Sequence, residues 1–195
     1  MESQYGKPGN SYFLLRHFFV KRPTISCWPE KVPIPLTKEG REGVKQLAKK
    51  LKEEKIDLIF SSDLLRTKET AQIIAKELGL EVNLDERLRE LNLGVYNGRK
   101  LEEFYRDFPK PEERFSKAPK NGENWSDCQK RMLDFIKEVD RKYQGKKVLI
   151  VGHGDPLWLL EGALKGLNEK ELLEEKSENY IKMGEFRKID LKIEL

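Results

Sequence analysis

Short apolar runs alternate along the chain with longer segments in which apolar residues recur at helical spacing. The two clearest runs are Tyr12–Leu15 and Val148–Val151, and neither is interrupted by a charged residue. Runs of this kind are typical of strands that are covered on both faces, as in a parallel sheet. The segment after Thr37 instead has apolar residues at positions 44, 47, 48 and 51, which form the stripe of an amphipathic helix. The pattern therefore predicts a layered α/β fold.

Strands and helices are expected to alternate over most of the chain, which favours a mostly parallel central sheet. The expected strands are Ser11–His17, Asp57–Ser61, Glu81–Leu84, Val148–Val151 and an edge strand or hairpin within Phe186–Ile193. The expected helices are one capped by Thr37 and fading near Lys55, one capped by Ser62 or Asp63 and stopped by Gly79, Leu101–Phe108, Trp125–Tyr143, Leu157–Leu164, and a short charged helix after Asn168. Asp155 is expected to cap the helix that follows Val148–Val151, with Pro156 in its first position.

The irregular segments separate a tail, one domain and a long loop. Residues 1–10 are polar and contain two glycines and a proline, so we expect a flexible N-terminal tail before a single domain at 11–195. Phe18–Leu36 carries four prolines, and structureless loops of this length are usually functional. Its basic residues Lys21, Arg22 and Lys31 are interpreted as solvated surface charges, with contact to an anionic ligand as the alternative. Its aromatic residues Phe18, Phe19 and Trp28 are interpreted as contacts that pin the loop to the core, with the lining of a pocket as the alternative.

Composition and charge limit the classes of partner. The chain has 38 basic and 34 acidic residues, a net charge of +4 and no block of like charge. We therefore expect no nucleic-acid arm and at most a preference for small anions. No apolar run approaches the roughly 18 residues of a membrane span, and no apolar signal-peptide core is present. Cys27 and Cys128 lie far apart without metal-ligand spacing. They are interpreted as reduced thiols of a cytoplasmic protein, with a disulfide between them as the open alternative.

The candidate chemistry lies where the predicted strands end. The chain has only two histidines: Arg16 and His17 end the first strand, and His153 follows the Val148–Val151 strand directly. Ligands of open α/β sheets bind at the carboxyl ends of the strands. Arg66 falls in the first turn of a helix that begins at a third strand end, where free backbone N–H groups already favour an anion. These positions predict an anion site with two guanidinium groups and two imidazoles.

The histidine pair has two other interpretations, a structural role and a metal site. Histidines in a core are often structural, but two of two at equivalent strand ends make coincidence a poor explanation. A zinc site would need a third ligand, and the neighbouring arginines would repel the cation. An oxyanion pocket fits better, because guanidinium groups bind phosphoryl oxygens and a neutral imidazole can attack phosphorus to form a covalent intermediate.

Several segments, in this order along the chain, carry a family resemblance. They are Leu14-Leu15-Arg16-His17, Pro35-Leu36-Thr37-Lys38-Glu39-Gly40, the stretch from Ser61 to Ala71 around Arg66, Leu88-Arg89-Glu90-Leu91 with Gly94 and Gly98, Gly122-Glu123, and Val151-Gly152-His153-Gly154. The chain thereby resembles the phosphatase branch of the histidine phosphatase superfamily, which is phosphoglycerate mutase-like. The resemblance extends over about 12–193 and implies a three-layer α/β/α fold.

The resemblance also implies a role for each residue. His17 would be the nucleophile that becomes phosphohistidine, and Arg16, Arg66 and His153 would hold the phosphoryl oxygens. Glu90 would protonate the leaving alcohol and then activate water. The implied activity is a metal-independent phosphomonoester hydrolase that needs no cofactor and acts on a small phosphorylated metabolite.

One departure from the family pattern concerns the residue after the nucleophile, which is usually glycine and here is Phe18. We expect Phe18 to make the pocket mouth more apolar than usual. Two alternative functions remain open at this stage. The chain could be a phosphoglycerate mutase, although it is short for one, or a silent member that binds a phosphorylated ligand without turnover.

Overall fold

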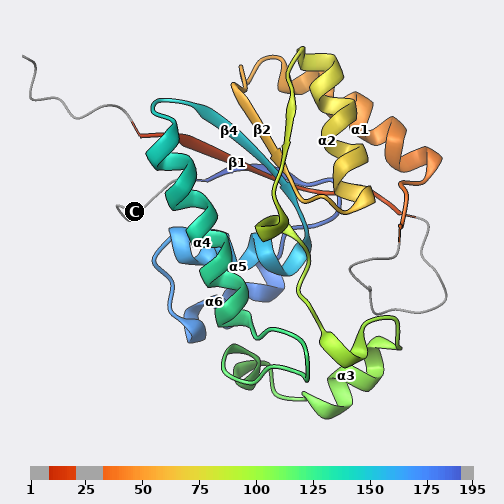
Figure 1. Ribbon diagram of the computed structural model, residues 1–195, viewed down its shortest axis with the longest axis vertical. Coiled ribbons are helices and arrows are strands. Elements are labelled where there is room, and N and C mark those ends of the chain that lie inside the picture. Colours follow the sequence, from red (N-terminus) through yellow and green to blue (C-terminus); the bar gives the residue numbers. More distant parts are fainter. Residues whose placement is uncertain (1–8, 21–32, 190–195) are drawn as a thin grey trace, which may run out of the picture.

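The computed structural model describes residues 9–20 and 33–189 (Figure 1). Its elements in chain order are β1 (Ser11–Arg16), α1 (Lys38–Leu51), β2 (Leu58–Ser61), α2 (Leu65–Leu78), β3 (Val82–Leu84), η1 (Glu86–Leu88), η2 (Gly94–Tyr96), α3 (Leu101–Asp107), η3 (Pro111–Phe115), α4 (Trp125–Lys142), β4 (Lys147–Gly152), α5 (Gly154–Leu164), α6 (Glu169–Asn179) and β5 (Phe186–Ile189). The expectations for Lys21, Arg22, Lys31, Trp28 and Cys27 lie outside the described residues, as do those for residues 1–8 and 190–195.

The five strands form one sheet in the order β3-β2-β4-β1-β5. β1 pairs in parallel with β4, β4 with β2, and β2 with β3, whereas β5 runs antiparallel to β1 at the edge. The prediction of a mostly parallel sheet with a C-terminal edge strand is therefore confirmed. The register aligns Arg16 with Gly152 and Ser61 with Val151, so β1, β4 and β2 end at the same edge.

Successive side chains of the central strands point to opposite faces and bury two separate cores. Phe13, Leu15, Ile59, Leu149 and Val151 pack against α1 and α2. The alternate residues of β1 and β4, which are Tyr12, Leu14, Val148 and Ile150, pack against α4 and α5. Figure 1 shows α1 and α2 on one side of the sheet and α4, α5 and α6 on the other, so the three-layer α/β/α architecture is confirmed.

Helix ends agree with the sequence at two positions and differ at two others. Thr37 caps α1 by accepting a hydrogen bond from the Gly40 N–H, and Gly79 ends α2 in the left-handed conformation. The expected caps of α2 and α5 were wrong, because neither helix has a side-chain cap. The Asp63 carboxylate is instead paired with Arg89. In α5, His153 occupies the N-cap position, so Asp155 and Pro156 lie inside the first turn.

The described residues add two facts about the class of protein. Cys128 is a free thiol that is completely buried in α4, and this burial raises its pKa well above the ordinary value. Of the helices in the described ranges, none combines the length and apolar character needed to cross a membrane.

Candidate active site

The parallel strand ends bring the two histidines together. His17 follows β1, and its backbone N–H donates to the Gly152 carbonyl at the end of β4. His153 follows Gly152 directly, and the two imidazole rings lie edge to face with centroids 5.5 Å apart. Both side chains are buried, at 5% and 0% exposure. The structure thus places at one point the two residues that the sequence puts 136 positions apart.

The backbone after β1 sets the tautomer of His17. Nδ1 of His17 lies 2.8 Å from the Phe18 carbonyl oxygen, which can only accept a hydrogen bond. The proton of a neutral His17 is therefore on Nδ1, and the lone pair is on Nε2. An imidazole oriented in this way can act as a nucleophile through Nε2.

Phe18 packs toward the protein interior. Its ring contacts the core cluster between α1, α2 and the sheet, and lies against two glycines, Gly43 in α1 and Gly184 before β5. A Cβ atom added to Gly43 or Gly184 would come within 2.7 or 2.8 Å of the ring. Phe19 is the aromatic residue that faces solvent here, with 54% of its surface exposed. The room for a large side chain after His17 is therefore provided by two glycines elsewhere in the chain.

His153 is held in its neutral form by its surroundings. Its Nε2 lies 3.0 Å from the Ser62 hydroxyl at the end of β2. That hydroxyl also accepts a hydrogen bond from the Leu64 N–H, so its own proton is available to Nε2. Burial, and then the charges of Arg66 and His17, lower the pKa of His153 well below its ordinary value. Among the described residues, the buried Nδ1 of His153 has no hydrogen-bond partner.

Two arginines place positive charge beside the histidines. Arg66 lies in the first turn of α2 and is 2% exposed, and Arg16 ends β1. Burial lowers the pKa of Arg66, the Glu90 charge raises it and the Arg16 charge lowers it, which places the three groups near one another. Arg16 is half-buried, and a buried cation such as Arg66 with a second cation near it is costly unless an anion compensates the charge. The arrangement therefore favours an anionic ligand.

The helices that start at this edge add polar backbone groups. α2 and α5 begin directly after β2 and β4, and both lack side-chain N-caps. The side chains of Thr37, Asn124 and Asn168, by contrast, cap α1, α4 and α6. Uncapped N–H groups and the helix dipole favour negative charge at a helix start. The missing caps of α2 and α5 contradict the expectation from sequence and lie next to the histidines; among the described α-helices, α3 also has no side-chain cap hydrogen bond.

Glu90 lies in a loop that is held by α4. Arg131 of α4 donates hydrogen bonds to the backbone carbonyls of Arg87 and Glu90. It also forms an ion pair with Glu123, in which Nη2 of Arg131 lies 2.7 Å from Oε1 of Glu123. Glu123 in turn accepts the Asn92 N–H at 2.9 Å. The loop is therefore fixed on both sides of Glu90 by one ion pair.

The surroundings of Glu90 favour its protonated form. Burial raises the pKa of this carboxyl group, and the negative charge of Asp155 raises it further, while Arg66 and Arg16 lower it. Its Oε1 accepts the Leu91 N–H at 2.9 Å. The group thus combines proximity to the arginines with a tendency to keep its proton, as expected of a general acid.

Sequence reasoning named Arg16, His17, Arg66, Glu90 and His153 as site residues, and the structure gathers these five groups at one sheet edge. It missed the contacts that orient them. Ser62 was interpreted as a helix cap and not as the partner of His153. The segment after α6 was assigned no site role from the sequence, yet Ile181 accepts a hydrogen bond from Arg16. The available signal for the Arg131–Glu123 ion pair was a charged residue, Arg131, directly before the buried Met132 of α4 and eight residues after Glu123.

Comparisons with known proteins agree with this geometry. A sequence model of the histidine phosphatase superfamily (branch 1) matches residues 12–180. Phosphoserine phosphatase 1 of Hydrogenobacter thermophilus is 30% identical over 191 residues, which cover 93% of this chain and 90% of that protein. The probable phosphoglycerate mutase GpmB of Escherichia fergusonii is 35% identical over 138 residues, which cover 68% of this chain and 64% of the mutase.

A solved structure extends the comparison to the fold. The mycobacterial glucosyl-3-phosphoglycerate phosphatase superposes with a TM-score of 0.78 at 25% identity, covering 91% of this chain and 88% of that chain. Together the comparisons support a phosphatase of a small phosphorylated metabolite, with mutases also among the relatives. Because the match runs through both histidine-bearing strand ends and nearly the whole described fold, this chain belongs to the histidine phosphatase superfamily, branch 1.

Proposed function

We propose that this protein hydrolyses phosphate monoesters of small metabolites through a phosphohistidine on His17, without a metal ion. The observation that carries the proposal is the hydrogen bond from His17 Nδ1 to the Phe18 carbonyl, which leaves the Nε2 lone pair for attack within a cationic pocket. Phosphoryl transfer depends mainly on positioning and charge stabilisation, and both guanidinium groups supply these.

In the first step, Nε2 of His17 attacks phosphorus. The N–P bond forms as the ester P–O bond breaks, and Glu90 gives its proton to the departing alkoxide, which leaves as an alcohol. A raised pKa keeps that proton on Glu90 until it is needed. Without it, an alkoxide would be a poor leaving group at neutral pH.

In the second step, the ionised Glu90 accepts a proton from a water molecule while the oxygen of that water attacks phosphorus. The N–P bond breaks, His17 regains its lone pair, and inorganic phosphate leaves. Both Glu90 and His17 return to their starting states, so the cycle is balanced without any further reactant.

Arg16, Arg66 and His153 are assigned to the phosphoryl oxygens in both steps. For His153 the assigned atom is Nδ1, because Nε2 is used by Ser62 while Nδ1 has no partner among the described residues. A neutral imidazole with its proton on Nδ1 can donate to an oxyanion. The pKa of His153, which is far below its usual value, supports a donor that does not change charge during the cycle.

The relatives indicate the kind of ester. Phosphoserine phosphatase and glucosyl-3-phosphoglycerate phosphatase are named for small phosphorylated metabolites, and each alignment covers at least 88% of the relative's length. The mutase alternative rests on relatives of which the chain spans 64%. We therefore favour hydrolysis over transfer between hydroxyl groups.

The test is an assay on a panel of phosphate esters, beginning with p-nitrophenyl phosphate, in the presence of a chelator. We expect turnover by the wild type, loss of at least 10²-fold in His17→Ala, and a protein-bound phosphate that is acid-labile and base-stable. Phosphate binding with no turnover of any ester would point to a silent binder. Activity that requires a bisphosphate and leaves no inorganic phosphate would favour the mutase.

A further inference from the structure

The two residues that follow α6 contact Arg16, one of the residues assigned to the phosphoryl oxygens. Tyr180 is the residue that ends α6, and the Arg16 guanidinium carbon lies 5.4 Å from the centre of its ring. The next residue, Ile181, accepts a hydrogen bond of 2.9 Å from NH1 of Arg16. A cation over an aromatic ring is attracted electrostatically, so Tyr180 and Ile181 together fix one face and one edge of this guanidinium.

Tyr180 is itself oriented by the first turn of α5, the helix that begins directly after His153. Its hydroxyl donates to Oδ1 of Asp155 at 2.9 Å. The fit is tight, because a Cβ atom at Gly154 would lie 2.2 Å from the tyrosine oxygen and 3.0 Å from the Arg16 guanidinium carbon. Only a residue without a side chain leaves room at this point for both groups. The Arg16 and His153 segments are thus linked through one tyrosine.

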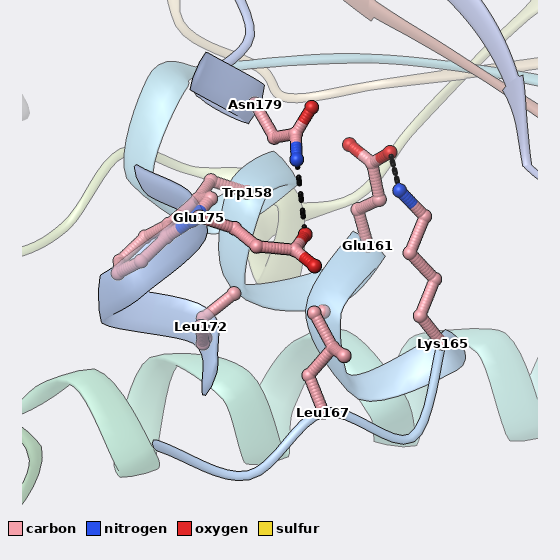
Figure 2. Close-up of a pocket in the computed structure, with 8 residues that line it drawn as sticks. Trp158, Glu161, Lys165, Leu167, Leu172, Glu175 and Asn179 are labelled. Atoms are coloured by element: carbon pink, nitrogen blue, oxygen red, sulfur yellow. Dashed lines mark hydrogen bonds and ion pairs between the residues drawn. The ribbon is translucent and has the colours of Figure 1, made fainter. Parts of the chain in front are cut away.

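The last turn of α6 is anchored to α5 and β5. The Asn179 side chain donates a hydrogen bond to Glu175, as Figure 2 shows. The backbone carbonyl of Asn179 accepts a hydrogen bond of 3.0 Å from Arg187 of β5. Arg187 also forms an ion pair of 2.7 Å with Glu161, a buried residue of α5 that is labelled in the same view. These contacts hold the backbone that precedes Tyr180.

Lys176 supports the position of Tyr180 through Asp155. The Lys176 ammonium lies 4.1 Å from the ring centres of both Trp125 and Trp158, and 3.7 Å from the Asp155 carboxylate. It forms an ion pair with the carboxylate that accepts the tyrosine hydroxyl, so Asp155 is held between Tyr180 and Lys176.

We propose that Tyr180 is a positioning residue for the phosphate pocket, which acts through Arg16 by directing the remaining guanidinium donors toward the phosphoryl group. The proposal rests on the function proposed above. Among the described residues, the buried Nε of Arg16 has no hydrogen-bond partner, which leaves it available to a ligand once NH1 is used by Ile181. A planar guanidinium with one edge and one face fixed retains a single orientation, and this lowers the entropy lost on binding.

The experiment measures the dissociation constant of inorganic phosphate for the full chain, together with kcat and KM on p-nitrophenyl phosphate. Tyr180→Leu is expected to weaken phosphate binding about tenfold, within the range of a partly buried cation–aromatic contact. Tyr180→Phe keeps the ring and should stay within about threefold of the wild type, as a rescue by the conservative variant.

Tyr96 provides a matched control. Its hydroxyl donates to Asp107 and its ring lies 5.5 Å from the Arg99 guanidinium, so it has the same type of partners in the α3 region. Tyr96→Leu should leave the phosphate dissociation constant unchanged. Thermal unfolding of each variant shows whether it is folded, and Tyr180→Met, which keeps most of the bulk, replaces the leucine variant if that does not fold.

A double-mutant cycle tests whether Tyr180 acts through Arg16. In an Arg16→Ala background, Tyr180→Leu should cause no further loss of phosphate affinity, because the group that it positions is gone. Unchanged phosphate binding in folded Tyr180→Leu, or an additive loss in the Arg16→Ala background, would overturn the positioning role and leave the phosphatase intact. A wild type that neither binds phosphate nor hydrolyses an ester would reject the proposed function and this inference together.

Discussion

Among the individual residues, Glu90 and Asp155 decide the working pH of the proposed enzyme. Burial raises the pKa of Glu90 most, and the charge of Asp155 adds to this. The charges of Arg66 and Arg16 act in the opposite direction and lower the pKa of Glu90, and Arg131 donates to the backbone carbonyl of Glu90. A protonated Glu90 is needed for departure of the alcohol, so activity should fall as pH rises through its pKa.

Asp155→Asn removes one of the charges that keep the proton on Glu90. The pKa of Glu90 should fall, so the basic limb of the pH profile of kcat/KM should move to lower pH. The measurement is the difference between variant and wild-type profiles on one ester, which cancels the ionisation of the substrate. Asp107→Asn, whose carboxylate is bound by Arg106 and Tyr96 in the α3 region, serves as control and should leave the limb in place. A limb that stays in place in Asp155→Asn or moves to higher pH would contradict the assignment.

Among the helices and strands, α1 shapes the segment that carries the nucleophile. Gly43 of α1 faces the ring of Phe18, and the Phe18 carbonyl accepts the His17 hydrogen bond. Helix packing and catalytic geometry therefore meet in one residue. Phe18 stands where the family usually has glycine, and its ring fits there because Gly43 of α1 has no side chain. The sequence pattern predicts only that this helix is amphipathic.

Gly43→Ala tests this dependence. Alanine favours a helix by about 1 kcal/mol over glycine, but its Cβ would lie 2.7 Å from Phe18 Cε1. Overpacking costs about 1–3 kcal/mol, so we expect net destabilisation of up to about 2 kcal/mol and a lower kcat, measured by urea unfolding and by the ester assay. In a Phe18→Gly background the same change should be neutral or stabilising. Gly9→Ala, which meets no atom within 4 Å, is the control; equal effects of Gly43→Ala in both backgrounds would exclude the clash.

The strand ends could be predicted from sequence because apolar runs mark buried strands, and the residue after each run then falls at the ligand edge. This rule sufficed for His17 and His153. Glu90 lies in an irregular loop and needed the family resemblance. Tyr180 could not be found, since its contact with Arg16 joins distant segments and depends on how α6 packs. Asp63 and Asp155 do not cap their helices as predicted, because their carboxylates bind tertiary partners instead: Arg89 in the case of Asp63 and Tyr180 in the case of Asp155.

For the molecule as a whole, one sheet supports both cores and the pocket. β1 and β4 contribute residues to the clusters on both faces, and the same strands end in His17 and His153. Ser62 and Arg66 come from the end of β2 and the start of α2. These site residues are thus brought together only when the central strands are in register, so a ligand that they bind should bind the folded state and not the unfolded chain.

Phosphate should therefore stabilise the whole fold. A ligand that binds only the native state at 100 times its Kd contributes about 2.7 kcal/mol, and in a domain of this size each kcal/mol raises Tm by about 2–4 °C. We expect Tm of the wild type to rise by about 5–10 °C in saturating inorganic phosphate, measured by calorimetry at constant ionic strength, with sodium chloride as the control salt. Arg66→Ala, which removes the buried guanidinium group of the site, should lose most of this increase because the anion loses its α2 partner. An equal increase in Arg66→Ala and wild type would mean that phosphate stabilises the protein from another surface, and would separate fold stabilisation from the pocket.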